Sequence, residues 1–455
     1  MHRNYAAMIG SLAVLIFGSF SASESSKLAP TPPMGWNSWD AYGFTIDEAQ
    51  FRDNVKVLSQ MQEYGWQYAV IDEGWYMQNP LGANTAEQKY LYDKNGLLEP
   101  VESRYPSAAK GVGFKPLADW VHAQGMKIGI HILRGIPRQV VDENLPIEGT
   151  SFHAVDAADK QATCPWEDAN YGIADNAAGQ AYYDSMLKRF AQWGLDFLKV
   201  DCISDRPYRA TEIRQIAEAI RKTKRPILLS LSPGPTNLDH ADEIAKYAEM
   251  WRITDDHWDV WKPQRTQGEF PFGLSEEFDR IAEWNKYVKP GSWPDPDMLP
   301  EGTLGPHPGW GDPRQSRYTQ DEQRTEFTLW AVSRSPLIFG GNLTKLDEFT
   351  RGLMTNHEAT QMDQDSSESG PALMPLDDGR PLPWRAWYAK VGSKTYAAVF
   401  NLGDESRSVD VPWLSFHAAD RPHAAYDVWN KRKVETAKVL HVVLAPHACA
   451  LWRIE

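Results

Sequence analysis

DFLKVDC, residues 196–202, is an apolar run that carries a lysine and a carboxylate, Lys199 and Asp201, to its end. A second run, MWRITDD at residues 250–256, brings Arg252 and two aspartates to its end in the same way. Near-continuous apolar runs of this length are typical of parallel strands that are buried on both faces. We therefore expect both segments to be strands of one α/β sheet, with their charged groups at the same edge.

Similar apolar runs recur from residue 34 to residue 343, and amphipathic stretches such as 178–193 and 208–221 separate them. This alternation predicts an α/β fold, a (β/α)8 TIM barrel, in which functional groups project from the C-terminal ends of the strands. The expected strands are residues 34–39, 68–75, 126–133, 197–203, 226–232, 250–256, 293–299 and 336–343. The polar residues at or near their ends, which a barrel gathers at one mouth, are Asp72, Glu73, Lys199, Asp201, Arg252, Asp256, Asp295 and Asp297.

Two strand ends that each deliver a carboxylate beside a cation supply what hydrolysis by a carboxylate pair needs. Ordinary strand-end aspartates held in ion pairs are the alternative. Asp295 and Asp297, in the segment WPDPD, resemble a metal-binding pair, but prolines fix that loop. We expect these two carboxylates to accept hydrogen bonds from neighbouring groups instead. No Cys/His cluster has metal-ligand spacing, so we expect neither a metal nor a cofactor.

Beyond about residue 365 the pattern changes to short alternating strands separated by Gly/Asp/Pro turns. These strands are expected at residues 384–391, 394–401, 406–411, 426–429, 439–444 and 449–454. The pattern predicts a small C-terminal antiparallel β-sandwich domain. We place the catalytic barrel at residues 24–365 and the β-domain at residues 366–455, and expect the β-domain to serve a structural role by packing against the barrel.

The N-terminus has the features of an export signal: Arg3 precedes an apolar run at residues 6–20, and small residues follow it. We therefore expect residues 1–23 to be a signal peptide and the mature protein to be secreted or periplasmic. The run is too short for a membrane anchor, so no membrane insertion is expected. The formal charge of −14, without a basic block, argues against nucleic acid as a partner. The sequence carries no signal for an oligomeric state.

The chain has three cysteines. Cys202 directly follows Asp201, and Cys164 lies in a loop about forty residues earlier. Because an exported chain can form disulfides, a Cys164–Cys202 bridge is plausible. Cys449 lies in an apolar C-terminal strand, where we expect a buried free thiol.

The segment TPPMGWNSW, residues 31–39, resembles the opening of glycoside hydrolase family 27, the melibiase or α-galactosidase family. The resemblance continues in order through IDEGW, LKVD, WRITDD, WPDPDML and RTEFTLWAVSRSPLIFGGNL, which ends at residue 343. It covers roughly residues 30–455. The resemblance implies a retaining exo-glycosidase that acts on a carbohydrate through a covalent glycosyl-aspartate.

Asp201 matches the family's nucleophile, and Asp256 matches its general acid/base because it completes an Arg-x-x-x-Asp pattern with Arg252. Asp255 is the rival candidate for the acid/base. Arg252 would bind near the sugar's 2-hydroxyl. Lys199 points to the same side of its strand as Asp201, so its charge would favour the ionised Asp201. Retention requires the two carboxyl groups to lie about 5 to 5.5 Å apart.

Trp39, Asp72 and Glu73 match the family's wall around O4 and C6 of the sugar. Most α-galactosidases of the family resemble Asp-Asp-Cys-Trp here, whereas this chain has DEGW, and Glu73 reaches about 1 to 1.5 Å further than an aspartate. β-L-Arabinopyranose has the ring stereochemistry of α-D-galactopyranose without the hydroxymethyl group. A glutamate at this position resembles the β-L-arabinopyranosidases of the family; a small backbone shift that still admits galactose is the alternative.

A second departure lies at LSPG, residues 231–234, where relatives often have Cys-(Glu/Asn)-Trp at the 2-hydroxyl recognition loop. Ser232 is then the substrate-binding candidate, and its small neighbours leave room for another group. His131 stands where many relatives have Tyr, and we expect it to line the sugar pocket.

The sequence thus predicts a hydrolase of terminal α-D-galactopyranosyl residues. The alternatives are a β-L-arabinopyranosidase of the same family, suggested by Glu73, and then an α-N-acetylgalactosaminidase. A non-catalytic sugar-binding protein is disfavoured because the chain keeps all four groups of the two strand ends: Lys199, Asp201, Arg252 and Asp256.

Overall fold

The computed structural model describes residues 28–81, 88–305, 311–374, 376–377, 379–435 and 438–454. The expected signal peptide, residues 1–23, therefore lies outside the described residues. No helix within the described ranges is long and apolar enough to cross a membrane.

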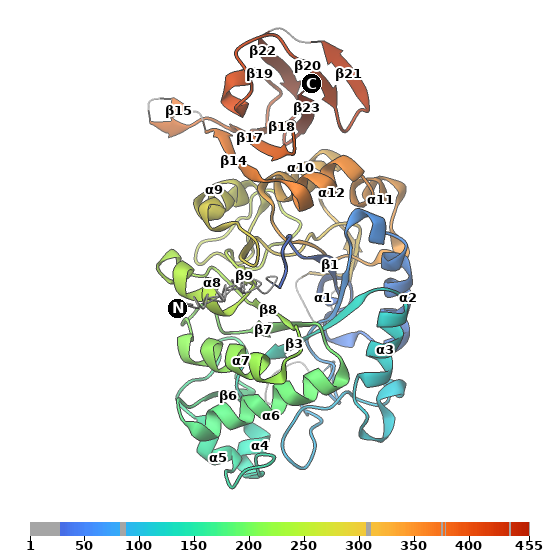
Figure 1. The fold of residues 1–455 in the computed structure, drawn as a ribbon, viewed down its shortest axis with the longest axis vertical. Helices are drawn as coiled ribbons and strands as arrows, with labels where there is room; N and C mark the ends of the chain where they lie inside the picture. Colours follow the sequence, from blue (N-terminus) through green and yellow to red (C-terminus); the bar gives the residue numbers. More distant parts are fainter. Residues whose placement is uncertain are drawn as a thin grey trace, which may run out of the picture.

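Eight parallel strands form the sheet of the barrel, and they coincide with the eight apolar runs (Figure 1). Their order in the sheet is β10, β9, β8, β7, β3, β2, β1 and β13. In chain order they are β1 (Met34–Asn37), β2 (Tyr68–Ile71), β3 (Lys127–Leu133), β7 (Phe197–Asp201), β8 (Leu228–Leu231), β9 (Met250–Arg252), β10 (Trp293–Asp295) and β13 (Leu337–Phe339). The TIM-barrel prediction is confirmed.

The two edges of this sheet meet just beyond β10. The backbone N–H of Leu299 donates to the carbonyl of Ile338 at 2.8 Å, and the N–H of Gly340 donates to the carbonyl of Leu299 at 2.9 Å. Most strands end earlier than the sequence predicts, because the last residues of each apolar run leave the ladder and enter the loops of the barrel mouth. Those residues include Asp72, Glu73 and Asp256, whereas Lys199 and Asp201 remain within β7.

Helices surround the sheet (Figure 1). They include α2 (Glu48–Ser59), α3 (Lys115–Ala123), α6 (Ala177–Trp193), α7 (Ala210–Thr223), α8 (Ala241–Tyr247), α9 (Leu274–Trp284) and α10 (Gln320–Ser333), followed by α11 (Glu348–Met354) and α12 (His357–Asp365). The sequence predicts α6 to within one residue because both ends carry signals. The Asn176 side chain accepts the N–H of Gly179 at its start, and Gly194, at φ +85°, ends it.

A small irregular region lies between β3 and β7. It holds β4 (Ile136–Pro137), β5 (Ala158–Asp159) and β6 (Asn170–Ile173), which form a three-stranded sheet, with α4 (Arg138–Asp142) and α5 (Ala154–Ala157). Buried Arg134 ties this region to β7 and α7. It donates to the carbonyl of Cys202 at 2.6 Å and pairs with Glu212 at 2.8 Å. The loop between β5 and β6 is therefore held beside the end of β7.

The C-terminal domain is an antiparallel sandwich, as predicted. Its larger sheet has the order β14 (Glu368–Leu373), β17 (Trp384–Val391), β18 (Lys394–Asn401), β23 (Cys449–Ile454), β20 (Ala424–Asp427) and β21 (Arg432–Glu435). β19 (Arg407–Pro412) and β22 (Val439–Leu444) pair as a second sheet and share an apolar core with one face of the first.

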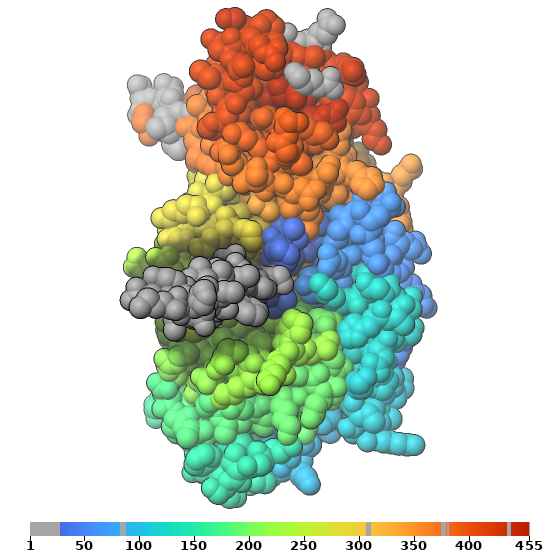
Figure 2. Space-filling model, viewed as in Figure 1, coloured from blue at the N-terminus to red at the C-terminus, as the bar shows by residue number. Residues whose placement is uncertain are grey.

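The other face of the larger sheet packs on the barrel. Figure 2 shows the C-terminal domain directly against the barrel. The Phe400 ring of β18 meets the Phe278 ring of α9 edge-to-face at 5.1 Å. Thr325 of α10 donates to the carbonyl of His447 at 2.7 Å, and Trp429 donates to the Thr328 hydroxyl at 3.0 Å. Because one apolar core contains residues of both domains, the β-domain stabilises the barrel.

We predict that Phe400→Ala lowers the free energy of unfolding by about 3–5 kcal/mol, because it opens a cavity in that shared core. Denaturant unfolding followed by tryptophan fluorescence measures the change. Val443→Ala is the control: Val443 is 66% exposed on β22, and we expect a loss of at most about 0.5 kcal/mol. Equal losses for the two variants would mean that the domains fold independently of their contact.

Candidate active site

A pocket of about 130 Å³ opens at the C-terminal ends of the barrel strands. Its walls are formed by Trp39, Asp40, Asp72, Glu73, His131, Trp166, Lys199, Asp201, Arg252, Asp256, His257, Trp258, Asp297 and Met298. The barrel thus brings together every site residue expected from the sequence except Ser232. Pockets for drug-sized ligands occupy about 300–1,000 Å³, so this one holds a single small ring rather than a chain.

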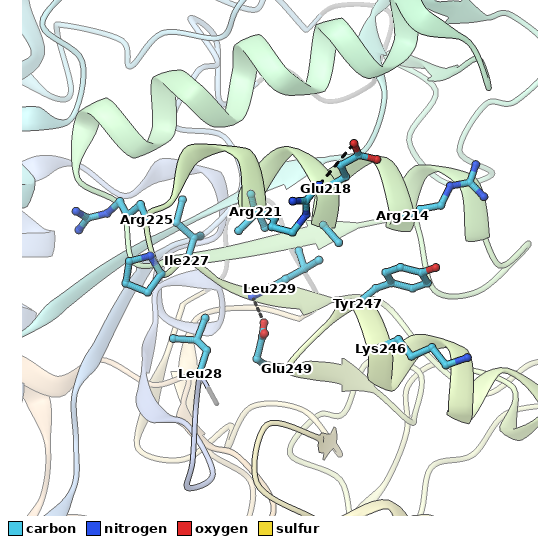
Figure 3. Close-up of a pocket in the computed structure, with 13 residues that line it drawn as sticks. Leu28, Arg214, Glu218, Arg221, Arg225, Ile227, Leu229, Lys246, Tyr247 and Glu249 are labelled. Carbon is cyan, nitrogen blue, oxygen red and sulfur yellow. Dashed lines mark hydrogen bonds and ion pairs between the residues drawn. The ribbon is translucent and has the colours of Figure 1, made fainter. Parts of the chain in front are cut away.

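A larger hollow of about 490 Å³ lies at the opposite end of the barrel, at the amino ends of β8 and β9 between α7 and α8 (Figure 3). Its arginines are committed to ion pairs. Arg225 pairs with Asp196 at 2.6 Å, and Arg214 pairs with Asp175 at 3.1 Å. Since the active sites of such barrels lie at the C-terminal ends of the strands, the smaller pocket is the catalytic candidate.

Asp201 lies at the end of β7, where one carboxylate oxygen has two protein partners. Oδ2 accepts the hydroxyl of Ser232 at 3.2 Å and lies 3.4 Å from Nε2 of His131. Burial alone would raise the pKa of Asp201. The hydrogen bond and charge of His131 and the charge of Lys199 outweigh it, so the pKa lies below its ordinary value. Asp201 is therefore ionised at neutral pH.

Ser232 lies behind Asp201 rather than in the pocket wall, and it is 1% exposed. The neighbouring Gly234 packs so closely on the next strand end that a side chain there would meet the carbonyl of Thr254. The residues of this loop that the structure describes contribute no wall to the pocket. The small side chains are therefore used for close packing.

Lys199 makes its direct ion pair with Asp72, at 2.9 Å, and not with Asp201 as alternation along the strand suggests. Its charge still lowers the pKa of Asp201. Asp72 also accepts the side-chain amide of Asn37 at 2.6 Å. Burial would raise the pKa of Asp72, but the ammonium of Lys199 and the ring of His131 hold it well below its ordinary value. Asp72 is thus a fixed carboxylate in the pocket wall.

Glu73, unlike Asp72, has a raised pKa. Burial, with the nearby charge of Asp201, raises its pKa to about 8, and the lowering effect of His131 does not offset this. The Tyr76 hydroxyl lies 3.4 Å from Oε1 of Glu73. At neutral pH Glu73 is therefore protonated, and its carboxyl group can donate a hydrogen bond to a ligand.

The two aspartates after β9 differ in what their carboxyl groups do. Asp255 is 4% exposed; it pairs with Arg206 at 2.9 Å and accepts the N–H of Asp256 at 2.8 Å. The Asp256 side chain is 46% exposed and borders the pocket. Burial at the pocket mouth and the neighbouring carboxylates Asp255 and Asp201 raise the pKa of Asp256, against the lowering effect of Arg252. The geometry thus leaves Asp256 available and commits Asp255 to structure.

Arg252 holds the loops of two strand ends together. Its guanidinium pairs with Asp297 at 2.7 Å and lies 3.3 Å from Asp256. Asp297 also accepts the N–H of His257 at 2.9 Å, and Asp295 accepts the N–H of Asp297 at 2.9 Å. The expectation that Asp295 and Asp297 accept hydrogen bonds from nearby groups is confirmed.

The Cys164–Cys202 disulfide is present, and it joins the loop between β5 and β6 to the residue that follows Asp201. Cys449 is free, as expected, although it is only partly buried. Five wall residues escaped sequence analysis: Asp40, Trp166, His257, Trp258 and Met298. Each follows a motif residue or the disulfide cysteine by only one or two positions, and that proximity was the available signal.

An ionised carboxylate and a second carboxyl group with a raised pKa, facing one small pocket at the mouth of a barrel, define a glycoside hydrolase. The comparisons with known proteins agree. The chain belongs to glycoside hydrolase family 27, the melibiase family. The family described as Alpha galactosidase A matches residues 168–365, and the Alpha galactosidase C-terminal beta sandwich domain matches residues 383–454.

Three relatives illustrate the range. A β-L-arabinopyranosidase of family 27 from Geobacillus stearothermophilus is 39% identical, with a TM-score of 0.87 over 94% of this chain and 97% of that one. A putative α-N-acetylgalactosaminidase from Bacillus halodurans is 35% identical, with a TM-score of 0.81 over 94% and 99%. Alpha-galactosidase A of Cellvibrio japonicus is 27% identical over 97% of this chain and 96% of its own length.

The raised pKa of Glu73 has a consequence for stability. A free glutamate has a pKa of about 4.3, so between about pH 4.3 and pH 8 the folded protein holds a proton that the unfolded chain has released. The contribution of this group to stability is complete below about pH 4.3 and falls as the pH rises to about 8, by at most about 1.4 kcal/mol per pH unit.

We predict that Glu73→Gln removes this loss. The free energy of unfolding of the variant, relative to that of the wild type, should therefore rise by at least about 1 kcal/mol from about pH 5 to about pH 8. Denaturant unfolding of both proteins at the two pH values measures the difference, and the exposed Glu405→Gln is the control. A difference that is constant with pH would show that Glu73 does not hold its proton.

Proposed function

We propose that this enzyme is a retaining exo-glycosidase that removes terminal β-L-arabinopyranosyl residues, and terminal α-D-galactopyranosyl residues less efficiently. The observation that carries the choice of sugar is Glu73 in the pocket wall. The pocket volume of about 130 Å³ supports exo action, because the pocket has room for one terminal ring.

In the first step Asp201 attacks the anomeric carbon of the terminal sugar, and the bond to the leaving oxygen breaks. Asp256 donates its proton to that oxygen. The low pKa of Asp201 and the raised pKa of Asp256 support these roles, since a nucleophile must be ionised and an acid must hold its proton until it is needed. The product is a covalent glycosyl ester of Asp201 and a free leaving group.

In the second step the carboxylate of Asp256 removes a proton from water, and the water oxygen attacks the same carbon and displaces Asp201. The enzyme returns to its starting state with Asp256 protonated. The two inversions together retain the configuration of the anomeric centre.

Within the wall, protonated Glu73 and ionised Asp72 offer one donor and one acceptor side by side. Together with Lys199 they can bind sugar hydroxyls in both senses of hydrogen bonding. The extra methylene of Glu73 brings its carboxyl group into the space that the family resemblance assigns to C6. A pentopyranose lacks the hydroxymethyl group there, whereas galactose must displace the Glu73 side chain.

The relatives support the same order of preference. The arabinopyranosidase from Geobacillus stearothermophilus is 39% identical to this chain, and a variant of it has been solved in complex with arabinose. The curated α-galactosidases of Cellvibrio, Arabidopsis and rice are 25–27% identical. They favour α-galactosidase activity as the second candidate.

An α-N-acetylgalactosaminidase is the third candidate, suggested by the relative from Bacillus halodurans. The acetamido group of its substrate needs space beside the sugar's 2-position. The loop at Ser232 and Gly234 is close-packed against Thr254, and its described residues do not border the pocket. This packing argues against the third candidate.

We predict that the wild type hydrolyses 4-nitrophenyl β-L-arabinopyranoside with a higher kcat/KM than the α-D-galactopyranoside. Glu73→Asp should raise the galactoside-to-arabinoside ratio about 10- to 200-fold, because it restores room for the hydroxymethyl group. The measurement is kcat/KM for both substrates and for the α-N-acetylgalactosaminide.

Glu405→Asp is the matched control: it makes the same change at an exposed residue of the C-terminal domain that does not line the pocket, and we expect the ratio to stay constant. An unchanged ratio in Glu73→Asp would remove Glu73 from the account of specificity. Absence of hydrolysis of all three substrates by the wild type would contradict the proposed function.

A further inference from the structure

Trp166 stands apart from the other tryptophans of the chain. It is 44% exposed, whereas every other tryptophan that the structure describes is buried or only partly exposed. Trp166 nevertheless lines the catalytic pocket, as Asp256 does. A large apolar side chain kept in water at the edge of a binding site is a contact surface for a ligand.

The position of Trp166 is fixed by its surroundings. The disulfide two residues earlier anchors its loop to Cys202, beside the nucleophile. The guanidinium of Arg206 lies over the indole ring, 5.2 Å from its centre. Such a cation–π contact restrains the ring.

All three nitrogens of the Arg206 guanidinium have protein partners. Nε lies 2.8 Å from Asp205, Nη1 lies 2.9 Å from Asp255, and Nη2 donates to the carbonyl of Gly234 at 3.0 Å. These contacts fix the guanidinium of Arg206, and the fixed guanidinium in turn holds the ring of Trp166 in place.

Through these contacts the position of Trp166 is linked to that of Asp256. The chain of contacts runs from the indole to Arg206, from Arg206 to Asp255, and from Asp255 to the backbone N–H of Asp256 at 2.8 Å. Asp256 must lie within hydrogen-bond reach of the oxygen that links the terminal sugar to the leaving group. Because Asp256 and Trp166 both line the pocket, a group attached to that oxygen can contact Trp166 where it leaves the pocket.

We propose that Trp166 is the platform for the leaving group, on which the apolar C–H face of a sugar ring stacks. The pocket has room for one ring, so a second ring must lie outside it. Indole provides a broad, rigid apolar face for such a ring. The proposal rests on the proposed function, because it assigns a site to the other half of the same substrate.

The test compares two substrates that share the terminal sugar and differ in the leaving group. One is the glycosyl fluoride, which has no ring on the leaving side, and the other is a disaccharide in which the terminal sugar is linked to glucose. The terminal sugar is the one that the wild type prefers, arabinopyranose or galactopyranose.

For Trp166→Ala we expect kcat/KM for the disaccharide to fall about tenfold or more, mainly through a higher KM, since stacking is lost before the reaction begins. Hydrolysis of the fluoride should fall much less, so that the ratio of kcat/KM for the disaccharide to that for the fluoride drops about tenfold. Trp166→Phe should restore part of the loss. Trp120→Ala is the matched control, because Trp120 also lies under a guanidinium, that of Arg52 at 4.5 Å, but on α3 away from the pocket.

Equal losses for both substrates in Trp166→Ala would overturn the proposal, since they would place Trp166 in the wall for the terminal sugar or in the stability of the loop. An unchanged disaccharide rate would overturn it as well. If the wild type hydrolyses neither the arabinopyranosyl fluoride nor the galactopyranosyl fluoride, the proposed function itself fails. This result differs from failure of the platform proposal alone, in which the wild type is active.

Discussion

The buried ammonium of Lys199 is the charge on which the rest of the site depends. It pairs with Asp72 and helps to lower the pKa of Asp201, and at Asp40 and Asp256, whose pKa values burial raises, its charge opposes the rise. The barrel places it there because β7 ends between β3 and β8, at the point where the strand ends converge. Without this cation the carboxylates that share the pocket would repel one another more strongly, and the pKa of Asp201 would rise.

Lys199 and Arg252 do not keep every carboxyl group of the pocket ionised. The carboxyl groups therefore differ in protonation state. Asp72, which pairs with Lys199, and Asp201, which lies 3.4 Å from His131, have lowered pKa values, whereas burial raises the pKa of Glu73 to about 8 and that of Asp297 to about 7. The pocket thus holds both ionised and protonated carboxyl groups, which the proposed mechanism uses for attack by Asp201 and for proton donation by Asp256. The contacts of Asp256 extend through Asp255 to Arg206 and Trp166, so the proposed acid and the proposed platform belong to one network of contacts.

The barrel and the sandwich could be predicted from the sequence because apolar runs and turn residues report burial directly, as in FLKVD of β7. Asp201 and Asp256 could be located because their motifs lie at strand ends. Which groups pair across the pocket could not be predicted: alternation places Lys199 and Asp201 on one side, yet the ammonium reaches Asp72, 127 residues away in the chain. Ser232 and Trp166 were misjudged or missed for a related reason, since loop packing and a disulfide decide where their side chains lie.

The central claim is that Asp201 forms the covalent bond to the sugar while Asp256 handles the proton. A cyclitol epoxide with the configuration of the sugar that the enzyme cleaves reacts with the nucleophile and remains attached to it. Peptide mass spectrometry of the inactivated enzyme locates the label. The account predicts one label, on Asp201, with loss of activity in proportion to labelling. A label on Asp256, Glu73 or any other side chain, or full activity in the labelled protein, would contradict it.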